Sequence, residues 1–289
     1  MRIAMVVTPF DDHNLQLARQ IGVTDIVIRY AGPEVSDMQP LCEQVQAHGM
    51  DVTVVEGYLP IDRVVLGLEG WQVQIDELSR LIVSMGACGI GVLCYNWMGL
   101  TDWTRTSVDT PGRGGALCTE FDREQVEALG PLEGPHVGAE ALWENLRRFL
   151  DHILPIAEQA GVALAMHPDD PPLTPLRGAE RIMVNPEAFE RLVQVAPSPA
   201  NGICFCQGNF AAMGANVPDT IRRFGKKDKI FFAHFRDIKG TVPKFEEAFH
   251  DDGDSDMAEC MRAYRDIGFE GPIRPDHVPT IAGEPNDPP

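Results

Sequence analysis

The sequence predicts a (β/α)8 barrel formed by a single domain over residues 1–289. Short apolar segments alternate with longer amphipathic segments, and eight of the apolar segments have the length of strands. They are nearly continuous in apolar residues, as in Ile26-Val27-Ile28, which is typical of parallel strands buried on both faces. Eight βα units without a second domain pattern favour closure into a barrel. An open doubly wound sheet is the alternative, but no GxGxxG follows the first strand.

The expected elements follow one another in order along the chain. The eight predicted strands are residues 2–7, 25–30, 51–56, 89–95, 162–167, 202–206, 229–234 and 272–276. Five intervening segments carry helical signals, and these are residues 34–48, 71–85, 138–160, 185–195 and 256–268. In the longest of them, Leu142, Leu146 and Leu150 recur on one face. Asn185 followed by Pro186 is a typical helix start, with a capping side chain and a proline in the first turn.

Two regions depart from the simple repeat. Residues 101–135 are rich in glycine, proline and charge, so we predict a long loop insertion after the fourth strand. It would lie on the catalytic face of the barrel and act as a lid or an interface arm. The sequence ends at Pro289, soon after the eighth strand, so we expect that the eighth helix of the barrel is absent from these residues or that the barrel is closed in another way.

Composition narrows the range of partners and compartments. The 24 Lys+Arg against 43 Asp+Glu give a net charge of -19, which disfavours nucleic acid and anionic membrane surfaces as partners. No segment reaches the ~18 uncharged apolar residues of a membrane span. The seven cysteines are odd in number and contain no CxxC, which indicates reduced thiols and a cytoplasmic location.

Four successive predicted strands end in residues of the types that commonly bind metal ions. They are His167, Cys206, His234 and Asp276. Catalytic groups of such barrels lie at the carboxyl ends of the strands. A lone histidine or cysteine at a strand end is more often structural, but four ligand types in succession are difficult to attribute to chance. Two imidazoles, a thiolate and a carboxylate predict a divalent metal site with positions open to a substrate.

The motifs around these residues are specific to a family. They read HPDDPP at 167–172, FCQG at 205–208, FAHFRD at 232–237, DGDSDM at 252–257 and RPDH at 274–277. With YN at 95–96 and DWTRT at 102–106, they resemble mannonate dehydratases, a family of xylose isomerase-like barrels. The resemblance runs from about residue 89 onward. It implies the same four metal ligands, Mn²⁺ or Fe²⁺ as the ion, and conversion of D-mannonate to 2-keto-3-deoxygluconate and water.

Further site residues are expected around this metal. We predict His277 as the acid/base group, because it directly follows a ligand, and Arg236 as a second catalytic residue. The predicted substrate-binding residues are Arg105, Asp169, Asp170, Asn96 and His250. Either arginine could instead form an ion pair within the protein, and the Asp-Asp-Pro-Pro run could simply shape a turn. The resemblance also implies a homo-oligomer, and a catalytic tyrosine at a position beyond residue 289.

Two other functions remain open at this point. A sugar isomerase or epimerase of the same barrel group would also use a divalent ion, but typically without a cysteine ligand, so Cys206 speaks against it. A non-catalytic sugar-acid-binding protein could keep the same metal site. No motif identifies any of the four tyrosines as the family's catalytic tyrosine, and this would fit a non-catalytic protein.

Overall fold

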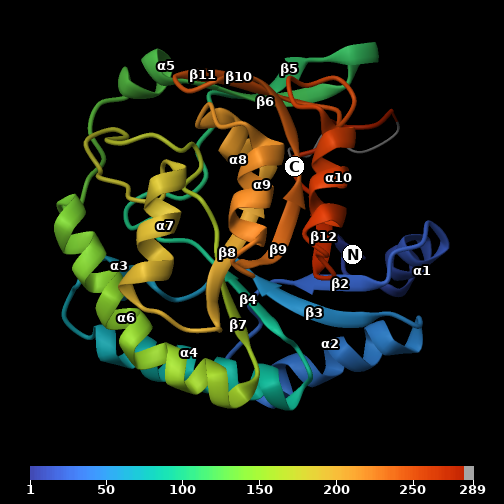
Figure 1. The fold of residues 1–289 in the computed structure, drawn as a ribbon, viewed down its shortest axis with the longest axis vertical. Helices are drawn as coiled ribbons and strands as arrows, with labels where there is room; N and C mark the ends of the chain where they lie inside the picture. Colours follow the sequence, from blue (N-terminus) through green and yellow to red (C-terminus); the bar gives the residue numbers. More distant parts are fainter. Residues whose placement is uncertain (283–289) are drawn as a thin grey trace.

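A closed barrel of eight parallel strands forms the centre of the computed structural model, which describes residues 1–282 (Figure 1). The strands are β1 (Arg2–Val6), β2 (Asp25–Ile28), β3 (Asp51–Glu56), β4 (Val92–Tyr95), β7 (Ala163–Met166), β8 (Asn201–Cys206), β9 (Ile230–Phe235) and β12 (Pro272–Pro275). They pair in that order, and β12 returns to β1. The predicted fold class is confirmed, with small shifts at the strand ends.

Helices surround the barrel and connect its strands (Figure 1). The main ones are α1 (Asp12–Gln20), α2 (Val35–Ala47), α4 (Trp71–Ala87), α6 (Ala139–Ala160), α7 (Pro186–Val195), α9 (Val217–Gly225) and α10 (Met257–Asp266). The five helices predicted from the sequence are confirmed. The side chain of Asn185 accepts a hydrogen bond from the amide of Ala188 at the start of α7, as its position before Pro186 predicted.

The apolar core has an outer and an inner layer. In the outer layer, buried side chains of the helices, such as Leu146 and Phe189, pack against the outside of the barrel. The inner layer fills the barrel with mostly small side chains, which are Ala4, Val27, Val54, Val92, Cys94, Ala165, Cys204 and Phe232. The barrel is therefore a packed core, and chemistry is confined to its ends.

The segment predicted as a long loop contains regular structure, and in this respect the prediction was wrong. It holds β5 (Ser107–Pro111), a 3-10 turn η1 (Arg113–Gly115), β6 (Leu117–Asp122) and α5 (Arg123–Glu127). Both strands join β10 (Asp237–Thr241) and β11 (Lys244–Ala248) in an antiparallel sheet, which lies across the top of the barrel in Figure 1. The pattern was hidden because β6 pairs with a strand more than a hundred residues later, where Phe121 meets Phe245.

Two short helices complete the description, and both follow barrel strands. They are α3 (Asp62–Leu66) after β3 and α8 (Gln207–Ala212) after β8. The predicted absence of an eighth helix after β12 concerns residues beyond 282, outside the described part of the chain. Among residues 1–282, no helix combines the length and apolar character needed to cross a bilayer. All seven cysteines, which lie within this range, are free.

Candidate metal centre and active site

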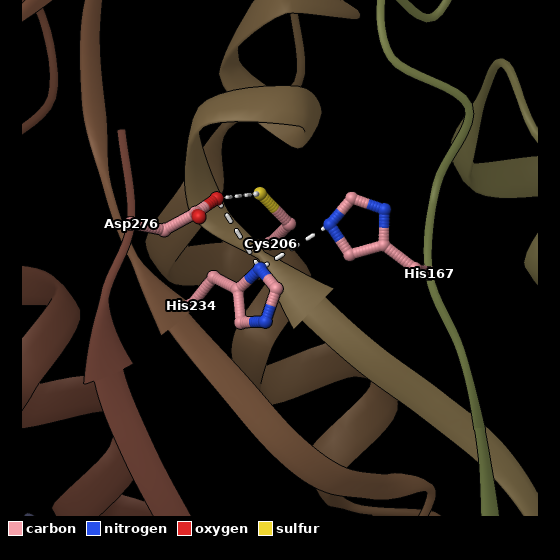
Figure 2. A group of neighbouring side chains, drawn as sticks. All are labelled: His167, Cys206, His234 and Asp276. Atoms are coloured by element: carbon pink, nitrogen blue, oxygen red, sulfur yellow. Dashed lines mark hydrogen bonds and ion pairs between the residues drawn. The ribbon is translucent and has the colours of Figure 1, made fainter. Parts of the chain in front are cut away.

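The four predicted ligands meet at the carboxyl end of the barrel (Figure 2). Their donor atoms all lie within 4.8 Å of one another. His234 Nδ1 is 3.2 Å from His167 Nε2 and 3.3 Å from Asp276 Oδ2. Cys206 Sγ is 3.8 Å from the same Asp276 oxygen. Residues far apart in the sequence thus present two nitrogens, one sulfur and one carboxylate oxygen to a common point.

This donor set fits a divalent transition ion. Ligand atoms that share one ion at ~2.0–2.3 Å stand roughly 3–4 Å apart, which matches the distances between these side chains. The Nδ1 of His167 lies 2.7 Å from the carbonyl oxygen of Pro168. A proton shared with that carbonyl leaves the Nε2 lone pair of His167 directed at the cluster. Imidazole and thiolate ligands favour transition ions over calcium.

Buried charges control the protonation of the cluster. Burial and Arg274 lower the pKa of His234, but Glu56 and Asp276 outweigh them and raise it to about 9. Burial alone would raise the pKa of Asp276, yet His277, Arg274 and His234 hold it well below its usual range. Asp276 is therefore ionised and ready to act as a ligand.

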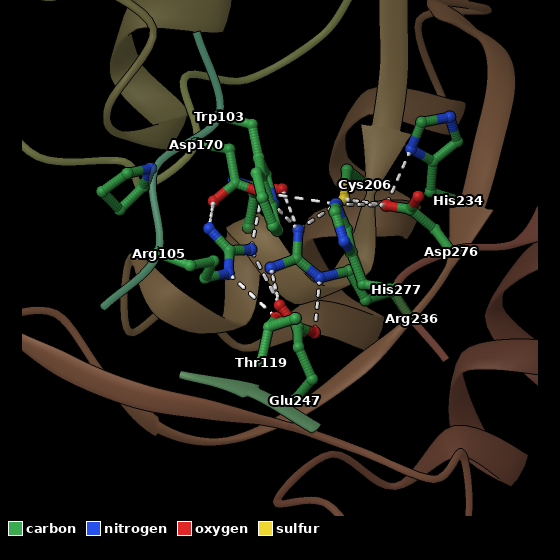
Figure 3. Close-up of polar contacts among 12 residues, drawn as sticks. Trp103, Arg105, Thr119, Asp170, Cys206, His234, Arg236, Glu247, Asp276 and His277 are labelled. Carbon is green, nitrogen blue, oxygen red and sulfur yellow. Dashed lines mark hydrogen bonds and ion pairs between the residues drawn. The ribbon is translucent and has the colours of Figure 1, made fainter. Parts of the chain in front are cut away.

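A network of four buried charged side chains lies beside the cluster (Figure 3). Arg105 contacts both oxygens of Asp170, at 2.7 and 3.0 Å, and Glu247 at 2.8 Å. Arg236 contacts the same two carboxylates, at 2.9 and 2.6 Å. Arg105 follows β4, Asp170 follows β7 and Glu247 belongs to β11, so these pairs fasten the small sheet to the mouth of the barrel.

Both arginines direct their N–H groups at carboxylates of the protein. The side chain of Arg236 is fully buried and that of Arg105 is 1% exposed, so a substrate oxygen would have to displace an existing partner. Arg236 also donates to Cys206 Sγ over 3.5 Å. A Cβ on Gly208 would lie 2.5 Å from Arg236 Nε, which explains why glycine follows the cysteine in the FCQG motif.

His277 lies next to the cluster because the chain turns after β12. The strand ends at Pro275 and His277 has a φ of 47°, so Asp276 and His277 both face the mouth although they are sequence neighbours. The imidazole stacks on Trp103 with the rings 5.4 Å apart, and its Nε2 is 3.8 Å from both Asp170 and Asp276. Burial lowers the pKa of His277 to about 4 despite the opposing effect of Asp276. The ring is therefore neutral at physiological pH.

The other predicted site residues lie around this centre with different contacts. Asp169 accepts a hydrogen bond from the amide of Met183 at 2.8 Å. Asn96 donates to Asp102 over 3.4 Å. The Nε2 of His250 lies 2.6 Å from the carbonyl oxygen of Phe235. None of these contacts joins the four-ligand cluster, whereas Asp170 reaches its edge through Arg236 and His277.

Three residues of the site were not identified from the sequence. Glu56 is the last residue of β3, so it occupies the same strand-end position that pointed to the four predicted ligands. Trp103 belongs to the DWTRT motif, but only its stacking on His277 indicates a role for its side chain. Glu247 lies on a hairpin outside the barrel, and no sequence signal places it near Arg105.

Comparisons with known proteins point to one family. A family model described as D-mannonate dehydratase (UxuA) matches residues 5–134 and 133–289. Mannonate dehydratase 2 of Halalkalibacterium halodurans is 32% identical over 310 residues, covering 96% of this chain and 90% of the relative. The mannonate dehydratase of Thermotoga maritima is 34% identical over 316 residues, covering 95% and 88%.

Solved structures extend this picture. The mannonate dehydratase from Streptococcus suis serotype 2 superimposes with a TM-score of 0.91 at 29% identity, covering all of this chain and 88% of that one. A 3-keto-D-glucoside 4-epimerase from E. coli gives a TM-score of 0.68 at 13% identity, covering 100% and 94% of the two chains. The second likeness shows only a shared fold.

The buried network yields a prediction about stability. Replacing Glu247 by Gln removes one of the two carboxylates that Arg105 and Arg236 share, and breaking buried ion pairs in this way should cost ~3–5 kcal/mol in the free energy of unfolding. Chemical denaturation would measure the change. The matched control is Glu140→Gln, which removes an exposed partner of Arg191 and should leave the midpoint unchanged. Equal midpoints for the two variants would contradict the prediction.

Proposed function

The chain belongs to the D-mannonate dehydratase (UxuA) family, and from this premise we propose that it removes water from D-mannonate to give 2-keto-3-deoxygluconate. The observation that carries the proposal is the four-ligand cluster at the barrel mouth with His277 beside it. A hydro-lyase acting on a sugar acid needs a group that binds the carboxylate end of the substrate and a group that moves protons. The cluster and His277 are suited to these two tasks.

His167, Cys206, His234 and Asp276 would hold the metal, which we propose is Mn²⁺ or Fe²⁺. Such an ion, when bound, supplies Lewis acidity that polarises the substrate carboxylate and makes the proton on C2 more acidic. Arg236 contributes from the protein side, because its guanidinium donates a hydrogen bond to Cys206 Sγ and so helps to hold that side chain in place. We propose that Arg105 and Asp170 fix the position of Arg236 by sharing its buried network.

His277 would move the protons of the elimination. A neutral imidazole has a free lone pair, so it can accept the C2 proton and later return a proton to the departing C3 hydroxyl, which leaves as water. The C2–H and C3–O bonds break, and the resulting enol becomes the 2-keto acid. Stacking on Trp103 keeps the imidazole in one orientation beside the cluster.

We also propose a setting for the enzyme. Seven free cysteines, six of them buried, suit a reducing cytoplasmic compartment. A homo-oligomer is proposed from the family resemblance, with the β5–β6 region as an available surface. Size-exclusion chromatography with light scattering would determine the oligomeric state.

The proposed reaction is tested with a panel of aldonates. The Mn²⁺-loaded protein should form a 2-keto-3-deoxy acid from D-mannonate faster than from its C2 epimer D-gluconate. EDTA should abolish turnover, and Mn²⁺ should restore it better than Ca²⁺, because imidazole and thiolate ligands disfavour calcium. If no aldonate yields a keto-deoxy acid, the dehydratase proposal is refuted. If turnover survives chelation, the proposed metal dependence is refuted.

Cys206 should be required for metal binding. Replacing it by Ser removes the soft ligand and should lower both metal content and activity strongly, as measured by elemental analysis and by the aldonate assay. The control is Cys42→Ser, a buried cysteine of α2 outside the cluster, which should retain its metal. Full metal occupancy with unchanged rates in Cys206→Ser would remove this residue from the site.

His277 should be required for chemistry but not for metal binding. His277→Asn should keep its metal and a similar KM while kcat falls by roughly 10²–10⁴-fold, the usual contribution of one general acid or base. Steady-state kinetics and elemental analysis separate the two effects. His152→Asn, an exposed histidine of α6, serves as the control. Loss of metal from His277→Asn would instead make this residue a support for the ligands.

A further inference from the structure

A buried ion pair lies beneath the four ligands and contacts two of them. Arg274 Nε and Nη2 contact the two carboxylate oxygens of Glu56, at 3.1 and 3.0 Å. Glu56 Oε1 lies 2.9 Å from His234 Nε2, on the side of the ring opposite the cluster. Arg274 Nη1 lies 3.0 Å from Asp276 Oδ1, while the other oxygen of Asp276 faces the cluster. All four residues are less than 10% exposed.

The chemistry of imidazole makes the contact with Glu56 consequential. A neutral histidine carries one proton, and only the nitrogen without the proton can bind a metal. Both carboxylate oxygens of Glu56 accept hydrogen bonds from Arg274, so Glu56 lies beside His234 as the acceptor of an ion pair. An ionised carboxylate only accepts hydrogen bonds, so it retains the proton on His234 Nε2. When a metal is bound, the nitrogen without a proton would then be Nδ1, which faces His167 and Asp276.

Stability alone is a weak reason for placing this pair inside the barrel. Its neighbours in the inner layer are apolar or thiol side chains, and Cys94 Sγ is 3.9 Å from Glu56. A buried ion pair generally gives no more stability than apolar side chains of the same volume. The pair adds no net charge to the core, so it can orient two ligands without opposing the charge of a bound cation.

We propose that Glu56 and Arg274 are positioning residues of the metal centre: Glu56 selects the metal-binding form of His234, and Arg274 holds both Glu56 and Asp276 in place. This inference rests on the proposed function, in which the four-ligand cluster holds the ion. Groups that orient metal ligands typically change metal affinity by ~10–100-fold when they are removed.

The first test is the Mn²⁺ affinity of Glu56→Gln, measured by counting free Mn²⁺ with electron paramagnetic resonance. Gln keeps the shape of Glu but can donate to His234 Nε2, which stabilises the wrong tautomer. The Kd for Mn²⁺ should rise ~10–100-fold. The control is Asp25→Asn, which removes a buried carboxylate paired with Arg2 at the amino end of β2 and should leave Kd unchanged. An unchanged Kd in folded Glu56→Gln overturns the inference.

A double variant separates positioning from mutual charge compensation. Glu56→Gln combined with Arg274→Met leaves no unpaired charge of this pair in the core, so folding should be at least as stable as in Glu56→Gln alone. If the pair positions the ligands, Mn²⁺ binding should remain weak in the double variant. Recovery of the wild-type Kd would show that the two residues only neutralise each other, and would overturn the inference.

Wild-type protein supplies a measurement that does not depend on any variant folding. In the Zn²⁺-loaded chain, ¹⁵N NMR of the His234 ring should show a proton on Nε2 and none on Nδ1. An unprotonated Nε2 overturns the inference. If the wild-type chain binds neither Mn²⁺ nor Zn²⁺, the proposed metal centre itself is refuted. If wild-type and variants bind Mn²⁺ equally tightly, only the inference about Glu56 and Arg274 is refuted.

Discussion

The register of three neighbouring strands is the constraint on which the site depends. Cys206 of β8 is paired with His234 of β9, and His234 is paired with Arg274 of β12. Side chains alternate along a strand, so Cys204 and Cys206, Phe232 and His234, and Arg274 and Asp276 all face the barrel interior. A slip of one residue in any strand would turn its ligand toward the surrounding helices. The same register that fills the core therefore assembles the cluster.

Buried charged side chains are the second organising feature. They form two groups, and in each group arginines are paired with carboxylates. Glu56 and Arg274 lie below the ligands inside the barrel, and Arg105, Asp170, Arg236 and Glu247 lie beside them under the small sheet. Each guanidinium has carboxylate partners, so little unpaired charge enters the low-dielectric interior. Both groups touch the cluster, one through His234 and Asp276 and the other through Cys206. The electrostatics of the ligands are thus set by fixed protein charges.

The barrel itself does not specify the reaction. An epimerase with 13% identity has the same fold over the full length of the chain. One mannonate dehydratase with this fold is 29% identical, and two others match in sequence at 32% and 34% identity. The difference must lie in the side chains at the strand ends and in the connections that cover them. In this chain these are Cys206 at the end of β8, the turn that presents His277, and the sheet that carries Glu247.

The sequence by itself determined the barrel, its eight strands and the four strand-end residues that meet at the barrel mouth, because strand periodicity and strand-end position are local properties of the chain. It also placed His277 beside Asp276. It did not determine where Arg105 and Arg236 direct their N–H groups, nor that residues 101–135 contribute two strands to a sheet with β11. Those features depend on contacts between residues 11 to 142 positions apart, such as Arg236–Glu247 and Arg105–Glu247. Only the tertiary structure decides them, since the strength of a buried charge contact depends on which groups folding brings together out of water.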